Sequence, residues 1–179
     1  MKDIEQKAVD MHRNFFDKTQ FAIDNGFFIE AISMEYAAIE SRLESICGQM
    51  GLPCGQKCPN RKDIKISQRI ECLRKNRNKN FAVFETTKLP KNFFTKNGEL
   101  RTWINRRDII IHGLFKNPFE YQKRTEDLEA CAQRGICYAK LLYNEAKRIQ
   151  RMRKNHSDIF DTYVTVCFNP NCKGNLEVK

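Results

Sequence analysis

Apolar side chains recur every three or four residues over much of the chain. The clearest series is Ile29, Ile32, Tyr36, Ile39, Leu43 and Ile46. This spacing places the side chains on one face of an α-helix, where they can be buried together. The segment therefore predicts an amphipathic helix, which ends where Gly48, Gly51 and Pro53 follow.

Four other segments carry helical patterns of the same kind. We expect helices over about residues 3–23, 64–75, 98–115 and 121–154. Only eight glycines and five prolines occur in the 179 residues, so few positions interrupt these segments. The sequence predicts an all-α fold, a bundle of four to five helices that forms one domain over residues 1–154.

Residues 155–179 have a different pattern. The stretch TYVTVCF, at 162–168, is rich in β-branched and aromatic residues, which predicts a short strand, and NPNCKGN after it predicts a turn. We expect a small β-like appendage at the C-terminal side of the helical domain.

The chain is strongly basic, with 32 Lys and Arg against 22 Asp and Glu. A net charge of +10 favours a polyanionic partner, most often nucleic acid, although such a charge can also serve solubility alone. No apolar run reaches the ~20 residues that a membrane span needs, and the charged start lacks the apolar core of a signal peptide. We therefore expect a cytoplasmic protein with no membrane partner.

The eight cysteines are then expected to be reduced thiols or metal ligands. Cys54 and Cys58 lie in one turn-rich segment, and Cys167 and Cys172 lie in another. Four thiolates can hold a structural zinc ion, and the alternative is four ordinary thiols in loops. The remaining cysteines, Cys47, Cys72, Cys131 and Cys137, fall on predicted helices and are expected to be small core residues.

The stretch NRRDIIIHGLF, at 105–115, combines groups that suit chemistry on a phosphate. Arg107 presents a planar fork of donors, His112 belongs to the residue type that titrates near neutral pH, and Asp108 can orient either neighbour. These groups are sufficient for cleavage of RNA without a metal. The ribose 2′-hydroxyl attacks the adjacent phosphorus, a 2′,3′-cyclic phosphate forms, and Arg107 meets the charge on the phosphoryl oxygens. The alternative is a surface Arg and a half-buried His.

Helix geometry separates this pair. Arg107 and His112 are five residues apart, which turns them about 140° from each other, whereas Asp108 and His112 share a face. One helix does not aim all three side chains at one atom, but two copies of the helix across a two-fold axis can. We therefore expect a homodimer, with Ile109, Ile110 and Ile111 anchoring the helix in the bundle.

Helix order and motif together resemble the HEPN superfamily. Its hallmark is an Arg, often followed by a polar residue, then four to six residues and a His; Arg107, Asp108 and His112 match the shortest spacing. The segment IESRLESI, at 39–46, is similar to the acidic and apolar second helix of such domains. The resemblance covers roughly residues 1–154.

The resemblance implies a function. Members with the motif are typically metal-independent endoribonucleases whose site is shared across a dimer, often in toxin–antitoxin, abortive-infection or CRISPR-linked defence. It implies that Arg107 and His112 are the catalytic pair, that Asp108 supports them, and that catalysis needs no cofactor. An antitoxin protein or a small RNA becomes a candidate partner. One toxin branch has a nucleotide-modified Tyr two residues after the His; Leu114 stands there instead, so we do not expect that modification.

Residues around the motif are weaker candidates for RNA contacts. Arg101 and Arg106 can hold flanking phosphates or act as plain surface charges. Trp103 can stack on a base or can belong to the core. Farther along, Lys147, Arg148, Arg151, Arg153 and Lys154 suit either the C-terminal end of a helix dipole or a polyanion.

Two other functions stay open. A non-catalytic helical RNA-binding or regulatory module would use the positive charge alone, and His112 would merely pack. A DNA-binding regulator with a zinc-holding appendage is the less favoured reading, because no recognition helix with a clear preceding turn is evident.

Overall fold

The computed structural model describes residues 14–52, 64–76, 87–117 and 124–155. The predicted all-α fold is confirmed, because the ordered elements of these residues are helices. The C-terminal appendage predicted for 155–179 lies, after Asn155, outside the described residues.

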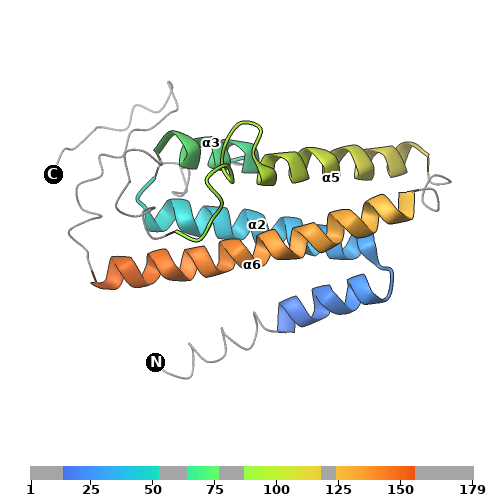
Figure 1. Cartoon of the computed structure of the whole chain (residues 1–179), viewed down its shortest axis with the longest axis horizontal. Coiled ribbons are helices and arrows are strands. Elements are labelled where there is room, and N and C mark those ends of the chain that lie inside the picture. The colour runs from blue at the N-terminus through green and yellow to red at the C-terminus, as the bar shows by residue number, and fades with distance from the viewer. Residues whose placement is uncertain (1–13, 53–63, 77–86, 118–123, 156–179) are drawn as a thin grey trace. The chain divides into compact units, whose positions relative to one another are not determined.

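The helices follow the predicted order (Figure 1). A helical segment over 14–24 precedes α2, and α3, α5 and α6 follow it. Their bounds are Phe28–Gln49 for α2, Ile66–Asn76 for α3, Glu99–Lys116 for α5 and Thr125–Asn155 for α6. The periodic pattern therefore located each of these helices to within a few residues.

The chain divides into two compact units, and α2, α5 and α6 each contribute to both. Unit 1 holds the described residues up to Ala38 together with those from Thr102 to Lys140. Unit 2 holds the described residues from Ile39 to Arg101 and those from Leu141 onward.

In unit 1, a sharp turn follows the 14–24 helical segment, at the break that the sequence predicted. The amide of Phe27 donates to the carbonyl of Ala22 at 2.8 Å, and the amide of Gly26 donates to that of Ile23 at 3.1 Å. Gly26 has a φ of 77°, which glycine adopts without the steric cost of a Cβ atom. This is a Schellman ending, and it lets the 14–24 segment stop directly before α2.

The core of unit 1 is apolar and comes from all its helices. Each fully buried aliphatic side chain adds about 1.5–3 kcal/mol to stability relative to exposure. The buried set is Ala22, Ile23, Phe28, Ala31, Ile32, Trp103, Ile104, Ile110, Ile111, Leu114, Leu128, Cys131, Ala132, Ile136, Tyr138 and Ala139.

Unit 2 has its own core and its own polar fastenings. The buried arginine Arg69 donates to the Ile64 carbonyl at 2.9 Å and forms ion pairs with Glu40 and Glu44 at 3.3 and 3.2 Å. The core is Ile39, Leu43, Ile46, Cys47, Met50, Leu52, Ile66, Ile70, Cys72, Leu73, Leu89, Phe93, Phe94, Leu100, Leu142, Ala146 and Ile149.

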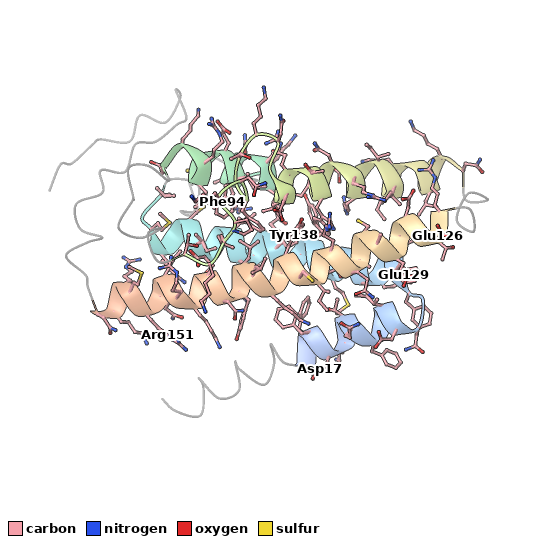
Figure 2. All side chains as sticks on the ribbon, viewed as in Figure 1. Asp17, Phe94, Glu126, Glu129, Tyr138 and Arg151 are labelled. Carbon is pink, nitrogen blue, oxygen red and sulfur yellow. The ribbon has the colours of Figure 1, made fainter. Side chains whose placement is uncertain are left out.

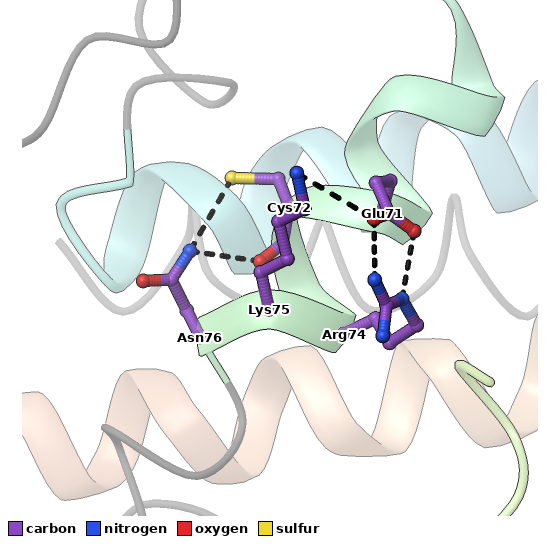
Figure 3. Close-up of polar contacts among 5 residues, drawn as sticks. All are labelled: Glu71, Cys72, Arg74, Lys75 and Asn76. Carbon is purple, nitrogen blue, oxygen red and sulfur yellow. Dashed lines mark hydrogen bonds and ion pairs between the residues drawn. The ribbon is translucent and has the colours of Figure 1, made fainter. Parts of the chain in front are cut away.

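The end of α3 is stabilised by its own side chains (Figure 3). Arg74 donates to the Glu71 carboxylate through Nε at 2.8 Å and Nη2 at 2.6 Å, and Lys75 lies 3.7 Å from it. Asn76 donates to the Cys72 carbonyl at 2.8 Å. The hydrogen bond from Arg74 holds the pKa of Glu71 below its usual value. Both cations of this turn thus already share a carboxylate.

Candidate functional site

The predicted trio lies on α5 within unit 1, where Arg107 is the best-held member. Its Nη1 donates to Oδ1 of Asp108 at 2.7 Å, and its guanidinium lies 4.3 Å from the centroid of the Tyr36 ring. A guanidinium over an aromatic face is attracted by the ring quadrupole. The ring and the carboxylate together fix where Arg107 presents its donors.

Arg107 also keeps unused hydrogen-bonding capacity. Its Nε atom is buried and has no hydrogen-bond partner among the described residues. A guanidinium carries five N–H donors in a fixed fork, and a phosphate can accept two of them side by side. The buried Nε is out of a phosphate's reach, but Nη2 likewise makes no hydrogen bond to any described residue. Arg107 is therefore held in place but is not saturated by the protein.

His112 lies on another side of α5 and is exposed. Asn105, Ile109 and Lys116 are exposed as well, and with His112 they follow one stripe of the helix at steps of four, three and four. Asp108 pairs with Arg107, so the face that it shares with His112 does not produce a contact. One copy of the chain thus does not bring Arg107 and His112 to a common point.

One isoleucine of the motif departs from the prediction. Ile110 and Ile111 are buried as expected, but the side chain of Ile109 is 67% exposed. The expectation that all three anchor the helix is wrong for Ile109, because three consecutive residues span about 200° of a helix and cannot all face one core. An exposed apolar side chain therefore stands directly beside His112 on the same stripe.

Trp103 is a core residue, so of the two roles that the sequence allowed for it, the structure shows the core role rather than base stacking. It is only 2% exposed, and its Nε1 donates to the carbonyl of Cys131 at 2.8 Å. Its ring meets Tyr138, labelled in Figure 2, edge to face at 6.4 Å. A base has no access to an indole that is enclosed in this way.

The two flanking arginines differ from each other. Arg106 is exposed and forms an ion pair with Asp127 of α6, so its charge is already matched by a carboxylate. Arg101 lies in unit 2 and is half-buried. Neither position therefore adds to unit 1 a second cation that is still available beside Arg107.

Glu35 is the residue of this region that the sequence reasoning missed. Its side chain is fully buried, and neither carboxyl oxygen makes a hydrogen bond of normal geometry to any described residue. Burial raises its pKa to about 9, and the backbone amide of Ile136 acts in the opposite direction. The carboxyl group is therefore protonated at neutral pH.

Gly135 of α6 makes the space that Glu35 occupies. A Cβ atom at this position would overlap Oε2 of Glu35 and would lie 2.7 Å from Cζ2 of Trp103. The nearby Cys131 thiol is also affected, because burial, and then the charge of Glu35, raise its pKa to about 11. The sequence did hold a signal: Glu35 stands three residues after Ile32 and four before Ile39, inside the apolar stripe.

No protein-family model, no curated protein and no solved structure shows significant similarity to the chain.

Of the cysteines predicted to be core residues, three are confirmed and one is wrong. Cys47, Cys72 and Cys131 are buried, whereas Cys137 is exposed. Cys137 lies one turn after Gln133 and Arg134 on the exposed side of α6, which accounts for the difference. It follows that helical position alone did not fix its burial.

The zinc prediction stays a prediction. Cys54, Cys58, Cys167 and Cys172 all lie outside the described residues. Within the four described ranges, no group of three or more His, Cys, Asp or Glu side chains is placed to bind a metal ion. No helix of the same ranges has the length and apolarity that crossing a bilayer requires.

Charge divides unevenly between the two units. The described part of unit 1 holds seven Lys and Arg against eight Asp and Glu, whereas that of unit 2 holds fourteen against five. The difference leaves unit 1 near neutrality and gives unit 2 a surplus of nine positive charges. The surplus therefore lies outside the unit that carries the Arg107–His112 motif.

Proposed function

We propose that this protein is a metal-independent endoribonuclease of the HEPN type, acting in the cytoplasm in antiphage defence or as a toxin. The observation that supports this most is the state of Arg107. It is fixed by Tyr36 and Asp108, it keeps unused donors, and it stands five residues before an exposed His112. A fixed guanidinium can meet charge that develops on a phosphoryl group without first reorganising.

The reaction proceeds by internal attack. His112 accepts the proton of a ribose 2′-hydroxyl, and the 2′-oxygen forms a bond to the adjacent phosphorus. The bond from phosphorus to the 5′-oxygen breaks, that oxygen leaves as a hydroxyl after it takes up a proton from water, and His112 returns its proton to the solvent. Arg107 binds the phosphoryl oxygens throughout. The products are a 2′,3′-cyclic phosphate end and a 5′-hydroxyl end, and no metal ion enters the balance.

The two side chains act together in a homodimer. Arg107 and His112 lie on different sides of α5, so one copy supplies the Arg and a second copy supplies the His. Ile109 suits such a contact, because it is an exposed apolar side chain on the stripe that carries His112. The second copy completes the site by bringing its own α5 against this stripe.

The test is cleavage of single-stranded RNA in the presence of EDTA. We expect the wild-type protein to cut and to leave cyclic phosphate ends, whereas Arg107→Ala and His112→Ala retain helical circular dichroism but do not cut. Arg106→Ala is the matched control, since this neighbouring arginine is committed to Asp127. It is expected to cut like the wild type. Equal cleavage by all four proteins would overturn the assignment.

A non-catalytic RNA-binding module is the second candidate. It is favoured by the charge distribution, because the surplus of positive charge lies in unit 2 and the motif lies in unit 1. RNA binding without cleavage by any of the four proteins is the result that supports this candidate over the first.

A further inference from the structure

The surplus charge of unit 2 is concentrated further by its own ion pairs. Glu40 and Glu44 pair with Arg69, Glu71 pairs with Arg74 and Lys75, and Glu145 pairs with Arg148. These four carboxylates, in the described part of unit 2, are thus already engaged with cations of the same unit. A surplus of positive charge is self-repelling, and a polyanion relieves that repulsion.

The basic cluster at the end of α6 separates into structural and available members. Arg148 donates to Glu145 at 2.7 and 2.9 Å, and Thr87 donates to the same carboxylate at 2.7 Å. Arg153 donates to the last carbonyls of α2, those of Gln49 at 3.0 Å and Gly48 at 3.5 Å. These two arginines hold unit 2 together. The helix-dipole explanation is therefore not needed for them.

Lys147 and Arg151 have no such commitment. Lys147 lies over the ring of Tyr143, with Nζ 4.6 Å from the centroid, and it pairs with no carboxylate among the described residues. Arg151 is exposed, projects outward from α6 (Figure 2), and makes no polar contact within the part of the chain that the structure describes.

A second helix adds a cation at the same ring. The guanidinium of Arg42, on α2, lies 5.5 Å from the centroid of Tyr143. Tyr143, Lys147 and Arg151 follow each other at steps of four, so they lie within about 80° of one another around α6. Arg42, Lys147 and Arg151 therefore form one row of positive charge, which we call the cation strip.

We infer that the cation strip binds the phosphate backbone of a single-stranded RNA. Along α6 the steps from Tyr143 to Arg151 cover about 12 Å, at about 1.5 Å per residue. Successive phosphates of a nucleic-acid strand are only a few ångströms apart, so a strip of this length can contact more than one phosphate. The cations arise from two helices, and the Tyr143 ring positions two of them, Arg42 and Lys147.

An acidic protein surface fits less well. Carboxylates on a folded protein are not spaced in a continuous row, and lysine and arginine contacts to phosphates are the usual means of holding a nucleic-acid strand in register. The inference rests on RNA as the partner in the proposed function, but it does not depend on cleavage.

The test measures RNA affinity as a function of salt. Each protein carries His112→Ala, so that the labelled single-stranded RNA stays intact. Lys147→Gln with Arg151→Gln removes one Lys and one Arg from the strip. Lys18→Gln with Arg134→Gln removes the same two charges from exposed positions in unit 1. Both double variants therefore have equal net charge, and only the place of the loss differs.

We expect the strip variant to bind more weakly and to lose about 1.4 from the slope of log affinity against log salt, at about 0.7 per phosphate contact. The control variant should keep the parental slope. Equal slopes for both variants would overturn the inference, because binding would then follow net charge alone. It would equally be overturned if the parental protein bound no RNA, or if polyglutamate displaced the RNA as well as unlabelled RNA does. If binding depends on the strip but the protein that retains His112 does not cut RNA, this inference stands and the proposed catalysis is overturned.

Discussion

Glu35 places a titratable group where water does not reach it. Its pKa in the folded protein is about 9, against an ordinary value of 4.5. Between these two pH values the unfolded chain releases the proton while the folded chain keeps it, so the unfolded state is favoured more as pH rises. Glu35 therefore lowers the stability of the fold progressively from about pH 4.5 to about pH 9.

We expect Glu35→Gln to raise the free energy of unfolding at neutral pH and to flatten its fall with pH. At pH 7 the carboxyl is ionised in the unfolded chain but protonated in the folded chain. This difference lowers the free energy of unfolding by roughly 3 kcal/mol, and glutamine avoids the loss because it does not titrate. Urea unfolding between pH 5 and 9 measures the effect. Glu30→Gln, an exposed position of the same helix, is the control and should leave the profile unchanged. A variant at Glu35 that keeps the wild-type slope would contradict the buried protonated state.

For single residues, the sequence predicted the chemistry of a side chain better than its burial. The spacing of Arg107 and His112 and the chemistry of each could be read directly. The exposure of Ile109 and Cys137 and the burial of Trp103 depend on which side of a helix meets a neighbour. Contacts between α2 and α5, such as Tyr36 with Arg107, join residues far apart in sequence, so no local pattern announces them.

Two glycines within helices show how an element is fitted to its surroundings. Glycine in a helix interior costs about 1 kcal/mol relative to alanine. This cost is offset only where a neighbouring group occupies the space of a Cβ atom. Gly135 has a reason, because Glu35 and Trp103 occupy the space where a Cβ would lie. Gly113 has none in the core, since its nearest neighbours are the outer atoms of the Arg124 side chain at 3.5 Å.

Alanine is therefore expected to have opposite effects at the two positions. Gly113→Ala should stabilise the protein by about 0.5–1 kcal/mol, through the gain in helix propensity. Gly135→Ala should destabilise it by about 1–3 kcal/mol, because the added methyl group overpacks the core. Thermal unfolding of both variants provides the comparison. If Gly135→Ala were also stabilising, the close approach of Glu35 to α6 would be wrong.

Helices were the part of the fold that local pattern predicted best. Apolar spacing located α2, α3, α5 and α6, because each buries a continuous stripe. The phase of α2 was less accessible. The buried stripe passes through Phe28, Ile32, Glu35 and Ile39 rather than through Ile29 and Tyr36, which are half-buried. Because Glu35 is a charged residue type, a pattern of apolar positions does not assign it to the buried stripe.

The whole molecule is proposed to work as a homodimer, and Ile109 is the position at which dimer formation can be tested. Burying one isoleucine contributes about 1.5–3 kcal/mol, and a two-fold interface would bury two of them. Removing this contribution and adding charge should weaken association by at least about tenfold, since about 1.4 kcal/mol corresponds to a factor of ten.

Ile109→Arg is accordingly expected to shift the protein from dimer to monomer and to abolish cleavage while helicity is kept. Sedimentation at a series of concentrations measures the first change, and the RNA assay measures the second. Phe21→Arg is the control, because Phe21 is 64% exposed in the same unit but lies off α5. A wild-type protein that cuts RNA as a monomer would contradict the shared site.

The enclosure of Trp103 has a practical consequence for watching this molecule unfold. It is the sole tryptophan of the chain, and its indole is fixed in the core of unit 1 by the carbonyl of Cys131 and the ring of Tyr138. Its fluorescence therefore reports the melting of unit 1 alone, whereas far-ultraviolet circular dichroism reports the helices of both units. One chain thus carries a built-in optical probe that tells whether its two units melt in step.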